Sequence, residues 1–387
     1  MSANQITHGA GGSVAAIDVD ALARRYGEVR MWTARLCEPL SAEDMVVQSM
    51  TDASPAKWHL GHTTWFFEAF ALDRFAKGYR RFDDRFAYLF NSYYNAMGER
   101  VARGSRGMIT RPGVDETLAY REHVDRAMVS LIEGAGADER SELAEIVEIG
   151  LQHEQQHQEL LLTDIKHLLS SNPLRPAYRD LGVGDSTVGT AMGWAEFDAG
   201  IRWIGHEGEG FAYDNEGPRH RVFLEPYALA DRLLTNEEYV AFVEDDGYRR
   251  SDLWLDEGWS LVQAEGWTAP LYWRKDGDRW LEFTLAGERR LDPNKPVAHL
   301  SFFEADAVAR WMGARLPTEF EWEAACAEAP IAGNFVESEM LHPIAAGTPV
   351  NGMLRQAFGD LWEWTRSDYG PYPGYAPPSG ALGEYNG

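Results

Sequence analysis

The chain has 387 residues but only two cysteines, Cys37 and Cys326, and they lie far apart in the sequence. Such a sequence has no disulfide framework, which suits a reducing compartment, and we expect a cytoplasmic protein. No run approaches the roughly 20 apolar residues that a membrane-spanning helix needs. The segment 1–18 also lacks the basic region and apolar core of a secretory signal. We therefore expect neither membrane insertion nor secretion.

Basic residues are scarce. Lys and Arg number 36 against 61 Asp and Glu, which gives a formal net charge of −25. This balance argues against nucleic acid and anionic membranes as partners. The hydrophobic content of 44% and the 14 tryptophans indicate well-packed cores rather than disorder. The length suffices for two domains.

The first half of the sequence predicts four helices, which favours a helical bundle. Asp18 is placed to cap the first helix, and Ser54 followed by Pro55 to begin the second. The third covers Asp115 to Leu131, and the fourth extends from about 141 to 169. The long connection 76–114 is rich in Gly, Arg and Tyr, and loops of this length inside a compact domain are usually functional.

The second half has a different pattern: short apolar runs broken by Gly, Asp, Asn and Pro. Residues 201–205 and 221–224 are expected strands, and Asn236–Glu244 and Phe303–Met312 are expected helices. The chain is therefore expected to be of α+β class with two domains. We place the bundle at 18–175 and a loop-rich α+β domain at 190–387, with the boundary near 172–195.

The predicted fourth helix carries the most informative spacing, His153-Glu154-Gln155-Gln156-His157. Residues four apart lie on one face of a helix, so the two imidazoles form half of a metal site. A pair of core histidines is the ordinary alternative. The spacing also matches the zinc-protease pattern H-E-x-x-H, in which Glu154 is the general base of a zinc hydrolase. No third zinc ligand follows at a short fixed distance.

A third ligand is expected from the second helix, which offers His59 and His62. They are three residues apart, so both face roughly the same side, and periodicity does not choose between them. A neutral three-histidine face suits Fe(II), Cu or Zn about equally by ligand type. In octahedral iron it leaves three positions open.

Several segments together resemble the sulfoxide synthases of ergothioneine biosynthesis. In the first half these are 58–68 (WHLGHTTWFFE), 91–94 (NSYY) and 152–160 (QHEQQHQEL). In the second half, 215–220 (NEGPRH), 314–319 (ARLPTE) and 358–365 (FGDLWEWT) resemble the formylglycine-generating-enzyme fold. The resemblance spans residues 20 to 387, and the combination of motifs is highly specific.

The resemblance implies a DinB-like four-helix bundle joined to a formylglycine-generating-enzyme-like (C-type-lectin-like) α+β domain. It implies Fe(II) as cofactor, bound by His62, His153 and His157. The implied reaction uses dioxygen to join the sulfur of cysteine or γ-glutamylcysteine to the imidazole C2 of hercynine and to oxidise it to a sulfoxide. The substrates are thus small molecules.

Other residues fit roles in that reaction. Tyr93 and Tyr94 lie in the long connection, where a phenol can donate a proton near iron, and one branch of the family uses a tyrosine in this loop. The family's sulfur-donor site uses two arginines three residues apart, and Arg103 and Arg106 match that spacing. Arginine suits this role because it binds carboxylates bidentately. Gln156 could hydrogen-bond the imidazole of the substrate.

The trimethylammonium group of hercynine calls for an aromatic pocket, because it donates no hydrogen bonds. Candidates in the second domain are Trp362, Trp364, Tyr369, Tyr372 and Tyr375. The family's second domain continues past the position of Glu384-Tyr385-Asn386-Gly387, so we expect a C-terminally truncated domain with an incomplete pocket. Formylglycine-generating enzymes use a cysteine pair in that last stretch. Only Cys326 lies in this domain, which excludes their activity.

Three alternatives remain at this point. Selenoneine synthases resemble the chain equally well and use a selenosugar in place of the thiol, although Arg103 and Arg106 favour an amino-acid donor. A zinc hydrolase would use Glu154 as its base. A non-catalytic metal- or thiol-binding module is the third possibility, since DinB-like bundles sometimes bind metal without redox chemistry.

Overall fold

The computed structural model describes residues 18–181, 189–208, 210–348, 354–378, 380 and 383. The chain divides into two compact units, Met1–Asp164 and Ile165–Gly387. The expectation of no secretory signal concerns residues 1–17, and that of a truncated second domain concerns residues 384–387. Both stretches lie outside the described part. No helix within that part is long and apolar enough to cross a membrane.

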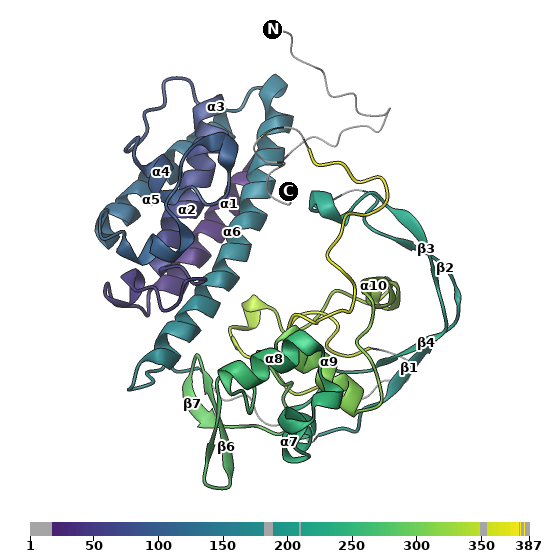
Figure 1. The fold of residues 1–387 in the computed structure, drawn as a ribbon. Helices are drawn as coiled ribbons and strands as arrows, with labels where there is room; N and C mark the ends of the chain where they lie inside the picture. Colours follow the sequence, from purple (N-terminus) through teal and green to yellow (C-terminus); the bar gives the residue numbers. More distant parts are fainter. Residues whose placement is uncertain are drawn as a thin grey trace. The chain divides into compact units, whose positions relative to one another are not determined.

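Unit 1 is helical, as expected (Figure 1). Its main helices are α1 (Val19–Cys37), α2 (Ala56–Phe67), α5 (Val114–Gly134) and α6 (Ala137–Ser171), and α6 extends past the division between the units. The Asp18 side chain accepts a hydrogen bond from the Ala21 amide at 3.0 Å, which confirms it as the cap of α1.

The predicted start of the second helix was wrong in its detail. Pro55 is the N-cap of α2, and no side chain caps this end. Ser54 lies one residue further out and uses its polar groups elsewhere. Its hydroxyl accepts from Arg106, and its amide donates to Asp164. The Ser54 hydroxyl oxygen, which the capping rule assigned to the helix amides, is therefore hydrogen-bonded to the distant Arg106 instead.

After α2 the chain continues through the π-helical segment η2 (Glu68–Leu72) and the short α3 (Asp73–Phe75). A π turn is rare and is often found at functional sites. Here its first residue, Glu68, is buried and accepts hydrogen bonds from the hydroxyls of Tyr79 at 2.6 Å and Tyr120 at 2.7 Å. The π turn thus places the buried Glu68 carboxylate where both tyrosine hydroxyls can donate hydrogen bonds to it.

The connection predicted as a long loop contains short helices. They are α4 (Phe86–Phe90) and the 3-10 segments η3 (Asn95–Met97) and η4 (Arg103–Met108). The Phe90 ring of α4 is fully buried, and Phe86 packs edge-to-face against Tyr120 of α5 with ring centroids 4.9 Å apart. Apolar packing of this kind fixes the connection against the bundle and positions the residues that follow.

Unit 2 is a mixed α+β unit with three small antiparallel sheets. Strand β1 (Trp194–Phe197) pairs with β4 (Tyr227–Ala230), and β2 (Gly200–Ile204) pairs with β3 (His220–Leu224). The third sheet is the meander β5 (Trp273–Asp276), β6 (Arg279–Thr284) and β7 (Gly287–Arg290). Its helices are α7 (Asn236–Glu244), α8 (Asp256–Glu265), α9 (Phe302–Trp311) and α10 (Glu319–Cys326). The α+β expectation is confirmed.

The core of unit 2 lies around α7 and α9. Tyr239 and Phe242 of α7 are fully buried and pack with Trp254, Val262 and Val308. Three helices begin with a capping box, in which the cap hydroxyl and the carboxylate three residues on satisfy each other's amides: Thr235 with Glu238, Ser301 with Glu304, and Thr318 with Glu321. These local signals mark where the helices begin.

Candidate metal centre

Three histidines of unit 1 converge on one point. His62 comes from α2, and His153 and His157 come from successive turns of α6. One ring nitrogen from each lies within 4.8 Å of the others, and all three residues are buried. It is the single group of three potential metal ligands found in the described part of the chain. The structure thus brings together the three residues that the family resemblance implied.

The protonation of these rings suits a metal. The Nδ1 of His62 lies 2.6 Å from the carbonyl oxygen of Phe90, which can only accept, so Nδ1 carries the proton. The lone pair of His62 Nε2 is then directed at His153 Nε2, 3.2 Å away. Burial lowers the pKa of His62 and His157 well below the usual value, and it lowers the pKa of His153 to about 4.

Neutral imidazole is the form that binds metals, and a donor set of three neutral rings fits a divalent first-row ion. The backbone carbonyl behind His62 is the kind of partner that usually orients a ligating histidine. These residues therefore fit a three-histidine metal site. All three ligands come from two helices, which leaves the remaining coordination positions for other molecules.

His59, the other candidate of the second helix, also faces this group. Its Nδ1 lies 2.8 Å from the Nδ1 of His157, and its Nε2 lies 3.0 Å from Oδ2 of Asp164. His59 and His62 therefore lie on the same side of α2, as their spacing predicted, but they contact different partners. His62 belongs to the group of three, and His59 stands behind His157.

Glu154 points away from the three histidines. Its side chain is fully buried and accepts hydrogen bonds from Arg30 at 2.7 Å, from Arg121 at 2.5 Å and from Thr33 at 2.6 Å. Arg121 and Arg30 hold the pKa of this carboxyl at about 2, although burial alone would raise it. A carboxylate engaged in this way is a poor proton acceptor, which removes the general base that the zinc-hydrolase alternative required.

The Trp58 indole lies between the Arg106 guanidinium and the His62 imidazole. The Trp58 indole stacks on the His62 imidazole, with centroids 4.6 Å apart and planes 11° from parallel. The guanidinium carbon of Arg106 sits 3.4 Å from the centroid of the same indole. Arg106 Nη1 donates to Ser54 at 2.9 Å, whereas its Nε is buried and has no hydrogen-bond partner among the described residues.

Burial and the nearby Arg103 lower the pKa of Arg106 to about 9. A buried guanidinium with an unused donor is costly unless an anion pairs with it. Arg103 differs, because it is exposed and donates from Nε to the carbonyl oxygen of Asp52 at 3.0 Å. Of the two predicted arginines, Arg106 therefore has the environment of an anion-binding residue.

The two predicted tyrosines are neighbours with different surroundings. Tyr94 is fully buried, and its ring lies 5.8 Å from that of Trp65, which in turn stacks on His62 at 5.7 Å. Tyr93 is 36% exposed, and its ring packs against that of Tyr94 at a tilt of 31°, with centroids 4.7 Å apart. The aromatic chain from the histidines therefore reaches Tyr94 first.

The remaining predicted residues are less constrained. Gln156 is half-buried on α6, and its amide forms no hydrogen bond within the described part of the chain. In unit 2, Trp362, Trp364 and Tyr369 are largely exposed. Tyr372 donates to Glu319 at 2.9 Å and Tyr375 to Asp214 at 2.7 Å. The structure does not bring these five aromatic side chains into one closed pocket.

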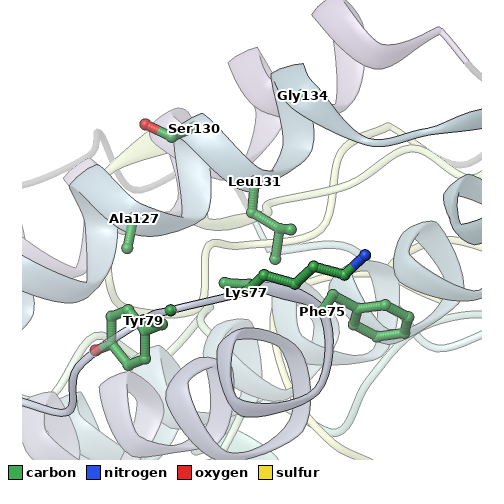
Figure 2. A pocket seen from close by; sticks show the side chains of 9 residues that line it. Phe75, Lys77, Tyr79, Ala127, Ser130, Leu131 and Gly134 are labelled. Carbon is green, nitrogen blue, oxygen red and sulfur yellow. The ribbon is translucent and has the colours of Figure 1, made fainter.

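A separate hollow lies on unit 1 between α5 and the segment after α3 (Figure 2). Ala127 and Leu131 of α5 face the stretch that carries Lys77 and Tyr79, and Phe75 also lines the hollow, next to Lys77. None of the three histidines lines it. This hollow is therefore distinct from the metal centre.

Sequence reasoning missed two contributors to this site, Trp58 and Asp164. Trp58 was noted only as part of the resembling segment 58–68, since stacking on an arginine from a distant segment leaves no local signal. Asp164 lies seven residues after His157, which is two helical turns, and this spacing was available in the sequence. A search for polar groups on the histidine face of α6 would have found it.

The comparisons with known proteins agree with this geometry. The DinB superfamily matches residues 25–161, and the sulfatase-modifying factor enzyme 1-like domain matches residues 184–348. A hercynine oxygenase of Mycolicibacterium thermoresistibile is 35% identical over 246 residues, which are 58% of this chain and 54% of that protein. A hercynine oxygenase of Mycobacterium tuberculosis is 32% identical over 59% of this chain and 57% of its own length. The chain is therefore similar to hercynine oxygenases over more than half of its length.

The chain spans about half the length of the curated relatives it matches. The formylglycine-generating enzyme of Streptomyces coelicolor is similar in a shorter region, with 28% identity over 42% of this chain. The expected two-domain fold, DinB-like and then sulfatase-modifying-factor-like, is thereby confirmed.

Proposed function

We propose that this protein belongs to the hercynine oxygenase family and is an Fe(II)-dependent sulfoxide synthase. It joins the sulfur of cysteine or γ-glutamylcysteine to the imidazole C2 of hercynine. The thiol loses its S–H bond and the imidazole its C2–H bond, and a C–S bond forms. One oxygen atom of O2 becomes the sulfoxide oxygen, and the other leaves as water. The four electrons that O2 accepts come from forming the C–S bond and from oxidising the sulfur.

The observation that carries this proposal is the group of three neutral imidazoles, His62, His153 and His157. Bound iron would supply the activation of dioxygen and a Lewis-acid position for the thiolate. Three histidine ligands from two helices leave room for both substrates and O2, which a four-ligand structural site does not. The similarity to proteins named hercynine oxygenase supports the same choice of reaction.

The chain's own side chains would hold the substrates. Arg106, stacked on Trp58 and with an unused Nε, would bind the carboxylate of the thiol donor. Tyr94 would donate a proton to the oxygen that develops negative charge. Gln156, on the same helix as two of the ligands, would hydrogen-bond the imidazole of hercynine.

The test is an oxygen-consumption assay after anaerobic reconstitution with Fe(II). Hercynine is supplied with cysteine, γ-glutamylcysteine or a selenosugar, and products are identified by mass spectrometry. We expect oxygen uptake and a sulfoxide with a thiol donor that carries a carboxylate. Turnover with the selenosugar alone would replace the proposal by a selenoneine synthase. If no donor gives oxygen uptake, the proposal is wrong and the protein is a non-catalytic metal- or thiol-binding module.

Arg106→Lys sharpens the test, because lysine keeps the charge but loses the planar fork and the stacking on Trp58. A charged hydrogen bond contributes about 1.5–3 kcal/mol, so the KM for the thiol donor should rise by roughly 10- to 100-fold. The matched control is Arg126→Lys, which changes an exposed arginine of α5. An unchanged donor KM in Arg106→Lys would remove this arginine from the donor site.

A further inference from the structure

His59 and Asp164 form a hydrogen-bonded chain that ends on one of the three histidines. His59 is almost fully buried on α2, three residues before His62. Its two ring nitrogens contact His157 Nδ1 at 2.8 Å and Asp164 Oδ2 at 3.0 Å. His157 and Asp164 lie on the same face of α6, two turns apart. The order of contacts is therefore Asp164, His59 and His157.

The carboxylate at the outer end decides where the protons of the chain lie. An ionised carboxylate only accepts hydrogen bonds, so the nitrogen of His59 that faces Asp164 must carry a proton. When His59 is a neutral imidazole it has only this one N–H, so its other nitrogen accepts. His157 must then donate from Nδ1, which leaves the lone pair of His157 on Nε2.

Asp164 is itself held in place. The backbone amide of Ser54 donates to the same Oδ2 at 2.8 Å, and the Ser54 hydroxyl is bound by Arg106. The Asp164 side chain is only 13% exposed, which limits its freedom to turn away. The N-terminal end of α2 therefore fixes the carboxylate that begins the chain of hydrogen bonds.

We propose that Asp164 and His59 are positioning residues that fix His157 as the Nδ1–H tautomer and so direct its Nε2 lone pair toward the metal. This role rests on the metal site of the proposed function. It parallels the contact between His62 Nδ1 and the Phe90 carbonyl, so two of the three ligands would be oriented from behind. Partners of this kind typically contribute 10- to 100-fold in metal affinity.

The first test needs no metal. In apo protein labelled with 15N-histidine at neutral pH, long-range 1H–15N correlations distinguish Nδ1–H from Nε2–H rings, and loss of one signal set in His157→Gln assigns His157. We expect His157 as the Nδ1–H tautomer in the wild type. An Nε2–H tautomer would overturn the inference, even if the protein binds metal and makes the product.

The second test measures metal affinity by anaerobic Fe(II) titration. His59→Leu removes the acceptor and should weaken binding by 10- to 100-fold. His59→Asn places an amide oxygen near the former Nδ1 and should recover most of that loss, which a packing role would not explain. The control is His123→Asn, at a histidine on α5 whose Nε2 donates to the Arg80 carbonyl oxygen at 2.9 Å, and this variant should bind Fe(II) as the wild type does.

The outcomes separate this inference from the proposed function. Wild-type affinity in His59→Leu would overturn the positioning role and leave the metal site intact. A wild type with the expected tautomer but no sulfoxide formation would overturn the proposed function and leave the positioning role standing.

Discussion

Tyr93 and Tyr94 are adjacent in sequence, yet burial separates their possible roles. Tyr94 is fully buried beside Trp65, and Tyr93 is partly exposed. A phenol that delivers a proton within a dry site contributes more than one in contact with water, because water competes for the same hydrogen bond. We therefore assign the proton donation to Tyr94.

Tyr94→Phe should leave Fe(II) binding unchanged and lower the rate of sulfoxide formation by about 100-fold, the lower end of what a general acid contributes. Tyr93→Phe is the matched control and should keep most of the activity. Anaerobic Fe(II) titration measures the binding, and mass spectrometry over time measures the sulfoxide and the other thiol products for both variants. An unchanged ratio of sulfoxide to other thiol products in Tyr94→Phe would exclude this hydroxyl from the reaction.

Single residues differed in how well the sequence revealed them. The spacing of His153 and His157 was readable because a helix puts residues four apart on one face. The choice of His62 came from the family resemblance, since His59 shares its face of α2. The partner of Ser54 was not readable, because Arg106 reaches it from a separate segment. Contacts between distant segments are set by the tertiary fold, which periodicity does not report.

At the scale of elements, α6 is held in the bundle by charge as well as by apolar packing. Glu154 pairs with Arg30 of α1 and Arg121 of α5, and all three side chains are almost completely buried. One to two turns earlier on α6, Glu148 pairs with Arg25 near the surface. The two ion pairs lie on one helix and differ mainly in burial, which makes them a matched comparison.

Removing the buried charge should be far more harmful than removing the exposed one. Glu154→Gln leaves two buried arginines without their carboxylate and should cost about 3 kcal/mol in the free energy of unfolding. Glu148→Gln, the control, should cost less than about 1 kcal/mol. Urea denaturation at pH 7 measures both values. Equal effects of the two substitutions would contradict a structural role for the Glu154 network.

The Glu154 contribution should also depend on pH. Its pKa of about 2 in the folded chain lies below the unfolded value of about 4.5, so its stabilisation is fully present above pH 4.5 and is lost as the pH falls toward 2. The difference between the wild type and Glu154→Gln should therefore shrink by about 1 kcal/mol between pH 7 and pH 3.5. A difference that grows on acidification would contradict the assignment.

The close approach of α6 to α2 depends on Gly150. A Cβ at this position would lie 2.4 Å from Cε1 of Phe67 and 3.0 Å from Cε1 of Phe66. Alanine favours a helix over glycine by about 1 kcal/mol, but overpacking of this kind costs about 1–3 kcal/mol. Gly150→Ala should therefore destabilise the protein.

Gly27 in α1 provides the control, because a Cβ there would meet nothing within 4 Å. Gly27→Ala should stabilise the protein by about 0.5–1 kcal/mol through helix propensity alone. Thermal denaturation followed by circular dichroism compares the two. A stabilised Gly150→Ala protein would show that the helices have room to move apart.

Helices were predicted better than strands. Residues 236–244 and 303–312 showed clear helical periodicity, and α7 and α9 are found there. The meander β5–β7 was missed, because its strands are four to six residues long and carry exposed charged side chains such as Lys275 and Arg290. Short strands with exposed charges lack the alternation that marks a half-buried strand.

At the scale of the whole molecule, composition and motif content were enough to predict an α+β chain with two domains. The family matches at 25–161 and 184–348 follow the same order. The pairing of β1 with β4 around the hairpin of β2 and β3 was not predictable, because it depends on long-range register. The strong negative charge of the chain bears on which partners we expect, and it carries no information about the fold.

The most direct test of this account is the stoichiometry of Fe(II) in anaerobically reconstituted protein, wild type against His157→Ala. We predict one Fe(II) per wild-type chain and essentially none in the variant, because two imidazoles remain where three are needed. The variant should keep its helical circular dichroism spectrum, since the bundle is held by contacts such as those of Glu154. A folded His157→Ala protein that still binds one Fe(II) per chain would contradict the three-histidine site.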